Sequence, residues 1–243
     1  MSGHSKWSQI KRQKGINDKK RGQTFTKLGN AITIAVKQGG GIGDPGQNFR
    51  LRLAVDAARN ANMPKENIER AISKAQTGKG GEFEEVIYEG FAPGGVSVII
   101  EAATDNTMRT TSEIKSLFNK HNASFGQPGS VSYQFKQEGE IIVKKNGKTF
   151  DDIFSIAVES GAEDLEDADD EVFIYTDTQD LAKVKDNLSS QGLEIVEAGL
   201  IRKPVVTVPI TDKDKFDKIA SFLNILEEMD DVQKVYSNME VNI

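Results

Sequence analysis

Three segments in the first third of the chain place apolar residues at three- to four-residue spacing, which puts each set on one face of an α-helix. The segments and their apolar residues are 24–38 with Phe25, Leu28, Ile32 and Val36; 48–61 with Leu51, Val55 and Ala58; and 64–76 with Ile68, Ile72 and Ala75. Thr24 is a candidate cap for the first helix, and Pro64 suits the first turn of the third. The pattern predicts a compact domain of three short helices.

From residue 82 the pattern changes to short apolar runs and alternation, which are typical of strands. We expect strands at 86–88, 96–100, 131–135, 140–143, 172–175, 193–196, 205–208 and 232–236, and helices at 108–121, 150–160, 179–191 and 212–228. The turn residues Pro93, Gly94 and Gly95 join the first two strands as a hairpin. Strands and helices with short antiparallel connections indicate an α+β fold with two small split-βαβ, ferredoxin-like units.

Two loop patterns invite a site interpretation and are better explained as connectors. Gly41, Gly43 and Gly46 have G-x-G-x-x-G spacing, but they follow a helix instead of a strand, so the dinucleotide interpretation fails. The acidic run 163–171 lacks the glycine and terminal glutamate of an EF-hand loop. We expect it to be a solvated connector.

The net charge of −6 averages two unlike parts of the 243-residue chain. Residues 1–80 hold 16 Lys and Arg against 5 Asp and Glu, a charge of +11, and the rest carries −17. Such asymmetry indicates a polyanionic partner for the basic part. The alternative is a basic face that is merely solvated.

The basic charge is densest in residues 1–23, where apolar side chains are sparse. With so little to bury, we expect this segment to be a flexible arm that orders on a partner. Its candidate nucleic-acid-binding residues, with one from the following helix, are His4, Lys6, Trp7, Lys11, Arg12, Lys14, Lys19, Lys20, Arg21 and Lys27. Trp7 either stacks on an exposed base or packs back on the helical domain.

Motifs for catalysis and metal binding are largely missing from the sequence. The chain has no cysteine and two histidines, His4 and His121, and it contains neither G-x-S-x-G nor a Walker A motif. We expect no catalytic residues, no metal site and no cofactor; a hydrolase built from Asp, Glu, Lys and Ser is the alternative. No apolar run approaches the roughly 20 residues that span a bilayer, and the start lacks the apolar core of a secretory signal.

Many short motifs, in colinear order over nearly the whole chain, resemble the YebC/PmpR family. They include Gly3-His4-Ser5-Lys6-Trp7, Asp18-Lys19-Lys20-Arg21-Gly22, Asn60-Ala61-Asn62-Met63-Pro64, Tyr88-Glu89-Gly90, Pro93-Gly94-Gly95, Asp105-Asn106, Arg109-Thr110, Gly129-Ser130-Val131 and Asp230-Asp231-Val232. The match at the N-terminus argues against a cleaved presequence. Gly29 departs from the usual pattern, since larger residues are common there.

The resemblance implies three domains, the middle one discontinuous: 1–80, 81–136 plus 205–243, and 137–204. Members are commonly described as probable DNA-binding transcriptional regulators. The family also resembles the mitochondrial translational activator of cytochrome c oxidase, and bacterial relatives are described as ribosome-associated factors that assist synthesis through proline-rich stretches. Both descriptions suit a basic arm.

We therefore expect a cytoplasmic, monomeric regulator of gene expression that binds DNA, or alternatively ribosomal RNA; a protein-interaction scaffold is a third possibility. Duplex DNA calls for a recognition helix or a dimerisation zipper, and neither is evident, whereas a basic arm folding into RNA grooves is a common solution. Candidate functional loops comprise Pro93, Gly94, Gly95, Asp105, Asn106, Arg109 and Thr110. Arg109 either meets phosphate or pairs with Asp105.

Overall fold

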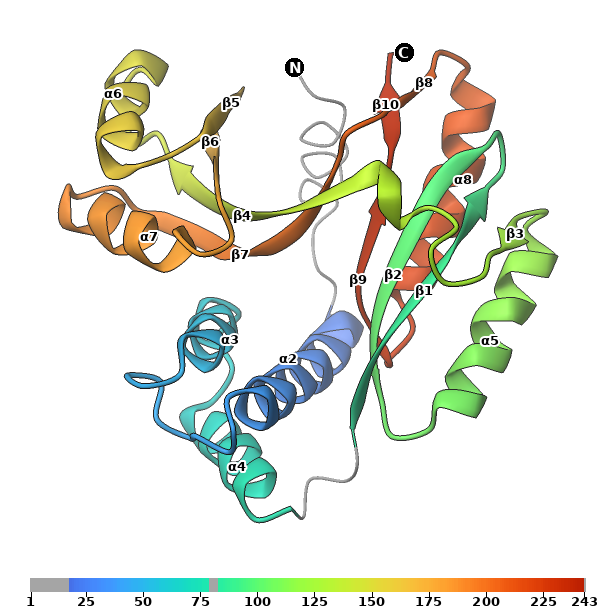
Figure 1. The fold of residues 1–243 in the computed structure, drawn as a ribbon, viewed down its shortest axis with the longest axis horizontal. Coiled ribbons are helices and arrows are strands. Elements are labelled where there is room, and N and C mark those ends of the chain that lie inside the picture. The colour runs from blue at the N-terminus through green and yellow to red at the C-terminus, as the bar shows by residue number, and fades with distance from the viewer. Residues whose placement is uncertain (1–17, 79–82, 243) are drawn as a thin grey trace. The chain divides into compact units, whose positions relative to one another are not determined.

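The computed structural model describes residues 18–78 and 83–242, and the chain forms two compact units (Figure 1). One unit runs from Phe135 to Val205. The other combines the described residues before Phe135 with those after Val205, so it is built from two separate stretches of chain. The chain is α+β, with helices at the start of its described part followed by antiparallel sheets, which confirms the predicted fold class.

Three helices open the described chain: α2 (Asp18–Gln38), α3 (Phe49–Asn60) and α4 (Lys65–Gln76). Most residues of the predicted apolar stripes are buried in one core, which also takes in Ala35 and Met63. Phe25, Leu28 and Ile72 are partly buried against that core. Asn48 caps α3 by accepting a hydrogen bond from the backbone N–H of Leu51 at 3.1 Å. Its amide also donates to the carbonyl of Ala35, which fixes the loop between α2 and α3.

Helix α2 begins about one and a half turns earlier than predicted. Residues 18–23 are helical, so the prediction of an unordered arm is wrong for them, and Thr24 lies inside the helix instead of capping it. Lys and Arg are good helix formers, and adding residues to an existing helix avoids the cost of nucleating one. The rest of the predicted arm, residues 1–17, lies outside the described residues.

The sheet of the second unit has the strand order β3-β1-β2-β9. Its strands are β1 (Glu84–Ala92), β2 (Val96–Thr104), β3 (Ser124–Phe125) and β9 (Val232–Ser237). The first two form the predicted antiparallel hairpin, and β9 brings the end of the chain beside β2. Gly90 lets β3 approach, because a Cβ there would lie 2.5 Å from the Phe118 ring and from the Ser124 carbonyl.

Two helices cover one face of this sheet: α5 (Thr107–Lys120) and α8 (Lys213–Glu227). They lie side by side, with the rings of Phe118 and Phe222 5.0 Å apart in an edge-to-face contact. The predicted strand at 205–208 is wrong. Instead, β8 (Val208–Ile210) pairs in parallel with β10 (Met239–Val241) as a small separate sheet.

The strand that alternation predicted at 131–135 does not form, because the backbone of this segment is bound by a buried carboxylate. Glu89 on β1 accepts hydrogen bonds from the backbone N–H groups of Val131 at 2.7 Å, Gly129 at 2.8 Å and Ser132 at 2.9 Å. These contacts bend the chain into a 3₁₀ turn, so pairing as a strand starts only at Phe135. Burial by itself would raise the pKa of Glu89, but the three N–H groups outweigh it and hold that pKa below its usual value.

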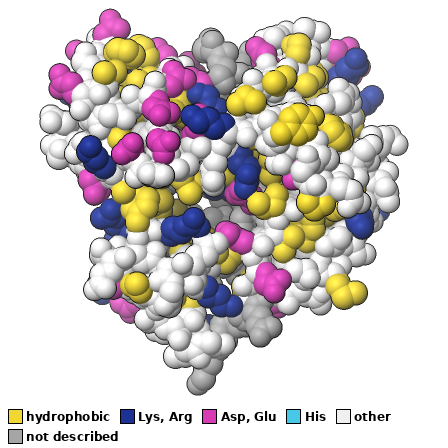
Figure 2. All heavy atoms as spheres, in the orientation of Figure 1, with side chains coloured by type: hydrophobic (Ala, Val, Ile, Leu, Met, Phe, Trp, Pro, Cys, Tyr) yellow, Lys and Arg dark blue, Asp and Glu magenta, His cyan; other side chains and the backbone are white. Residues whose placement is uncertain are grey.

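The unit from Phe135 to Val205 is an antiparallel sheet of order β5-β6-β4-β7 with two helices. Its elements are β4 (Phe135–Lys144), α6 (Phe150–Ser160), β5 (Asp164–Ala168), β6 (Glu171–Thr176), α7 (Leu181–Ser190) and β7 (Ile195–Pro204). Thr149 and Asp152 form a capping box at the start of α6, and Gly161 ends it with a positive φ of 102°. In the space-filling view, Asp and Glu side chains gather over the part that holds α6 and β5 (Figure 2).

One further prediction fails in this unit, and another has the wrong bounds. The acidic run 163–171 is not a connector, because β5 pairs with β6 through it and buries Glu166 and Ala168. Charged side chains on an edge strand are a common protection against pairing with other chains. The strand predicted at 193–196 is present but begins at Ile195, as part of the longer β7, which pairs with β4 as far as Pro204.

Candidate nucleic-acid interface

The predicted cations divide between described and undescribed parts of the chain. His4, Lys6, Trp7, Lys11, Arg12 and Lys14 lie outside the described residues. Lys19, Lys20 and Arg21 occupy the first turn of α2. Three of the predicted binding residues therefore belong to a helix.

Lys27 lies further along α2 and is half-buried. Its ammonium group donates a hydrogen bond to the backbone carbonyl of Glu227, at the C-terminal end of α8. A cation at that end also interacts favourably with the helix dipole. Lys27 therefore ties α2 to α8, a role that the sequence pattern did not indicate.

The three helices carry most of the exposed cations of the described N-terminal part: Lys37, Arg50, Arg59, Lys65, Arg70 and Lys74. Several have partners nearby. Arg59 pairs with Asp56 at 3.7 Å, and Lys65 pairs with Glu69 at 3.6 Å. Arg70 and Lys74 make no hydrogen bond or ion pair with any residue in 18–78 or 83–242, so their charge is available to a ligand.

The Pro93-Gly94-Gly95 loop is the tight turn of the β1–β2 hairpin. Gly94 and Gly95 have φ values of 83° and 79°, which only glycine adopts without strain. Pro93 and Gly94 line a groove of about 790 Å³, whose other side carries Lys120, His121 and Lys218. His121 also lies over the Phe222 ring, with 5.5 Å between ring centroids, so part of its role is packing.

The loop at 105–110 is held together by charges and hydroxyls. Arg109 donates to Asp105 at 3.0 Å and to Asp231 at 2.8 Å. Asn106 caps α5, since its side chain accepts from the backbone N–H of Arg109. Thr110 is buried and donates to Asp231 at 2.6 Å. Two carboxylates therefore already neutralise Arg109, and the predicted pair with Asp105 is present.

Asp231 is the centre of this cluster, and its environment fixes it as an anion. Burial works to raise its pKa, while hydrogen bonds from Arg109, Thr110 and Thr104 lower it, and the lowering prevails. The same contacts raise the pKa of Arg109, with Asp231 the larger contributor. The sequence motif at Asp230-Asp231-Val232 marked this position without revealing what the carboxylate binds.

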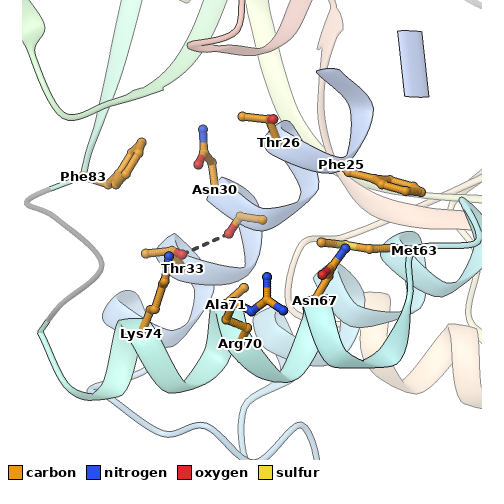
Figure 3. Close-up of a pocket in the computed structure, with 11 residues that line it drawn as sticks. Phe25, Thr26, Asn30, Thr33, Met63, Asn67, Arg70, Ala71, Lys74 and Phe83 are labelled. Carbon is orange, nitrogen blue, oxygen red and sulfur yellow. Dashed lines mark hydrogen bonds between the residues drawn. The ribbon is translucent and has the colours of Figure 1, made fainter. Parts of the chain in front are cut away.

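Sequence reasoning missed a groove between α2 and α4 (Figure 3). Helix α2 contributes Phe25, Gly29 and Asn30, and α4 contributes Asn67, Arg70 and Lys74. Its volume is about 450 Å³. The spacing of Asn67, Arg70 and Lys74, three and four residues apart, was the available signal, since it places them on one face of a helix.

Within the described residues, no group of three or more His, Cys, Asp and Glu side chains is arranged to hold a metal ion. The same part of the chain contains no helix that is both long and apolar enough to cross a membrane.

Comparison with known proteins matches nearly all of the sequence. Residues 5–78 match the model of the TACO1/YebC protein N-terminal domain, and residues 83–239 match that of the TACO1/YebC second and third domain. A relative from Persephonella marina is 47% identical over 245 residues, covering 100% of this chain and 97% of the relative. One from Thermotoga maritima is 48% identical, covering 100% and 95%. Both are named "probable transcriptional regulatory protein".

The fold is also similar to that of a solved structure. The crystal structure of a conserved hypothetical protein, Aq1575 from Aquifex aeolicus, has a TM-score of 0.87 and 44% sequence identity. The similarity covers 93% of each chain.

Proposed function

The chain belongs to the TACO1/YebC family, and from that premise we propose that it is a nucleic-acid-binding regulator of gene expression. The shared name of its relatives supports a regulator of this type. Their name is not that of an enzyme class, and we propose that the chain is not an enzyme. We further propose a monomer that acts in the cytoplasm and is divided into domains at 1–80, 81–136 plus 205–243, and 137–204.

The observation that carries the proposal is the separation of charge along the fold. Residues 18–78, which form the three helices, contain eleven Lys and Arg against five Asp and Glu. The unit from Phe135 to Val205 contains eight against seventeen. Positive charge concentrated in one part of a protein attracts phosphate backbones and makes their binding dependent on salt. The adjacent residues 1–17 add four Lys and Arg and no acid.

DNA binding in transcription is the first form of the proposal, because it agrees with the name of the relatives. The helices α3 and α4 are joined by four residues, 61–64, and α4 is the candidate recognition helix. Recognition helices contact base edges with residues near their N-terminus. In α4 these positions hold Lys65, Glu66 and Glu69.

Those acids favour a second candidate, a ribosome-associated translation factor that binds ribosomal RNA. Glu66 and Glu69 are exposed, and carboxylates near phosphates weaken duplex binding by like-charge repulsion. A basic segment that binds irregular or single-stranded RNA needs no recognition helix. A protein-interaction scaffold is the third candidate, in which an acidic protein takes the place of the nucleic acid.

Co-sedimentation with ribosomes, at near-physiological salt and with excess duplex DNA as competitor, separates these forms. Retention on the ribosome despite the competitor assigns the protein to translation. Release by the DNA supports the transcriptional form. Binding to a partner fraction that survives nuclease treatment, with no affinity for either nucleic acid, contradicts the proposal and favours the scaffold.

A charge-reversed variant tests the assignment of the surface. Changing Lys19 and Lys20 to Glu should abolish most of the binding in either assay. Changing Lys148 and Lys183 to Glu is the control, because both are exposed lysines in the acidic unit and the change in charge is the same. Equal losses from both changes would mean that net charge alone governs binding.

A further inference from the structure

We propose that the groove between α2 and α4 binds one unpaired nucleotide of a single-stranded RNA or DNA. The inference rests on the proposed function and adds to it a defined site for a base. The cations of the first turn of α2 would attract any polyphosphate chain, whereas this groove would distinguish an unpaired strand from a duplex.

The groove is formed by matching faces of two helices. On α2, Phe25, Gly29 and Thr33 follow each other at four-residue spacing, and on α4 Asn67 and Lys74 lie two turns apart. The two helices share one hydrophobic core, to which α2 contributes Ile32 and Val36 and α4 contributes Ile68. A volume of about 450 Å³ lies within the roughly 300–1,000 Å³ typical of ligand pockets.

The charge of the lining selects an anionic ligand. Arg70 and Lys74 stand one turn apart on α4, and neither has a hydrogen-bond or ion-pair partner in the described part of the chain. Among the described residues that line the groove there is no Asp or Glu. A phosphate there would meet two cations without having to displace a carboxylate, and Arg offers a planar, two-pronged donor to phosphate oxygens.

The remaining side chains suit a flat, polar ring. The side-chain amides of Asn30 on α2 and Asn67 on α4 have no hydrogen-bond partner among the described residues, and each can both donate and accept. Phe25 lies on α2 near Met63 and supplies an aromatic face (Figure 3). Stacking on an aromatic ring and hydrogen bonds to a base edge are how proteins hold unpaired bases. In a duplex the pairing edge of each base is already occupied.

Gly29 keeps the groove open. A Cβ at this position would meet nothing within 4 Å, so no close packing requires the glycine. Glycine inside a helix is less stable than alanine there, because its backbone loses more freedom on folding. Gly29 therefore lowers the stability of the helix, and close packing does not require it. Because Gly29 lines the groove, we explain the glycine by the space that it leaves there.

The test measures the affinity of the full chain for labelled ten-nucleotide probes by fluorescence anisotropy: single-stranded RNA, single-stranded DNA and duplex DNA. Gly29→Leu fills the groove without removing a charge, and the open space around Gly29 lets it fold. We expect at least about a tenfold weaker affinity for single strands, the scale of one lost stacking contact. Affinity for the duplex should stay unchanged. A larger loss with RNA than with DNA would identify RNA as the ligand.

Gly22→Leu is the matched control. Gly22 also lies on α2, a Cβ there also meets nothing within 4 Å, and it does not line the groove. Gly22→Leu should bind single strands as the unaltered chain does. If Gly29→Leu does so too, or if both variants lose the same affinity, the groove is not a nucleotide site. Duplex binding that persists in that case leaves the proposed function standing.

A second measurement reports on the groove directly and does not depend on binding by the N-terminal residues 1–23. Titration of AMP into the full chain, followed by ¹⁵N NMR, should shift the side-chain amide signals of Asn30 and Asn67, and Arg70→Gln should weaken the response. Arg59→Gln, which changes the same charge outside the groove, should not. Absence of shifts at both amides would overturn the inference, even if the protein binds nucleic acid elsewhere.

Discussion

The guanidinium of Arg109 donates a hydrogen bond of 2.8 Å to the carboxylate of Asp231, 122 residues further along the chain. Arg109 lies in the first turn of α5, and Asp231 immediately precedes β9. The contact joins the two stretches of chain that build one unit. The loop at 105–110 therefore helps to hold the fold together, whether or not it also contacts a partner.

Removing this carboxylate should destabilise the unit. In Asp231→Ala, the hydroxyls of Thr104 and Thr110 and the guanidinium of Arg109 lose their shared acceptor. Because Thr104 and Thr110 are buried, we expect the free energy of unfolding to fall by roughly 1–3 kcal/mol. Urea denaturation measures the change. Asp105→Ala, which removes only the exposed partner of Arg109, should have a much smaller effect; an equal effect would show that Asp231 has no special role.

The stability of the protein should depend on pH through Glu89. Its pKa is lower in the folded chain than in the unfolded one, so its contribution is present above the unfolded value of about 4.3. That contribution is lost as the pH falls through the folded value. Glu89→Gln should be less stable at pH 7, because an amide cannot accept from all three N–H groups, and its stability should fall less between about pH 5 and pH 3. Denaturation at each pH measures the free energy of unfolding. If this free energy fell by the same amount in the unaltered chain and in Glu89→Gln, the account would be contradicted.

Gly29→Ala should make the protein more stable. The added methyl group meets no neighbouring atom within 4 Å, and alanine is the better helix former. We expect a gain of about 0.5–1 kcal/mol in the free energy of unfolding, seen as a higher melting temperature by circular dichroism. A loss of stability would mean that the glycine serves the packing of α2.

Local pattern predicted the helices and most of the strands, because each has its own apolar periodicity. It failed where contact with a residue distant in the sequence determines the secondary structure. The alternation of Val131 and Tyr133 is that of a strand, yet Glu89 draws the backbone N–H groups of this segment into a turn. The composition of the acidic run containing Glu166 predicted a solvated connector, but pairing with β6 makes it a strand.

The candidate site was predictable to a similar degree. Composition alone located the basic part of the chain, since charge needs no partner to be counted. The partners of Lys27 and Arg109 were not predictable, because Glu227 and Asp231 lie far away in the sequence. The groove between α2 and α4 required the packing of two helices, which the spacing of Asn67, Arg70 and Lys74 by itself does not specify. The binding roles of the N-terminal cations stay a prediction.

The start of α2 at Asp18 fixes how the N-terminal segment should be removed. Deleting residues 2–17 leaves the helix whole and removes Lys6, Lys11, Arg12 and Lys14. Because the deletion leaves α2 and its packing on α3 and α4 intact, we expect the melting temperature to change little. A deletion that extends to residue 21 should lower the melting temperature, since it cuts into α2.

The salt dependence of nucleic-acid binding tests the central claim most directly. For the full chain on duplex DNA, the slope of log K against log salt should be about −5 to −7, the value for six to eight neutralised phosphates. The chain lacking residues 2–17 should show a much weaker affinity and a slope shallower by about 3 to 4, because four cations are gone. Equal affinity and equal slope for the two chains would contradict the account, because the N-terminal cations would then make no contact with the nucleic acid.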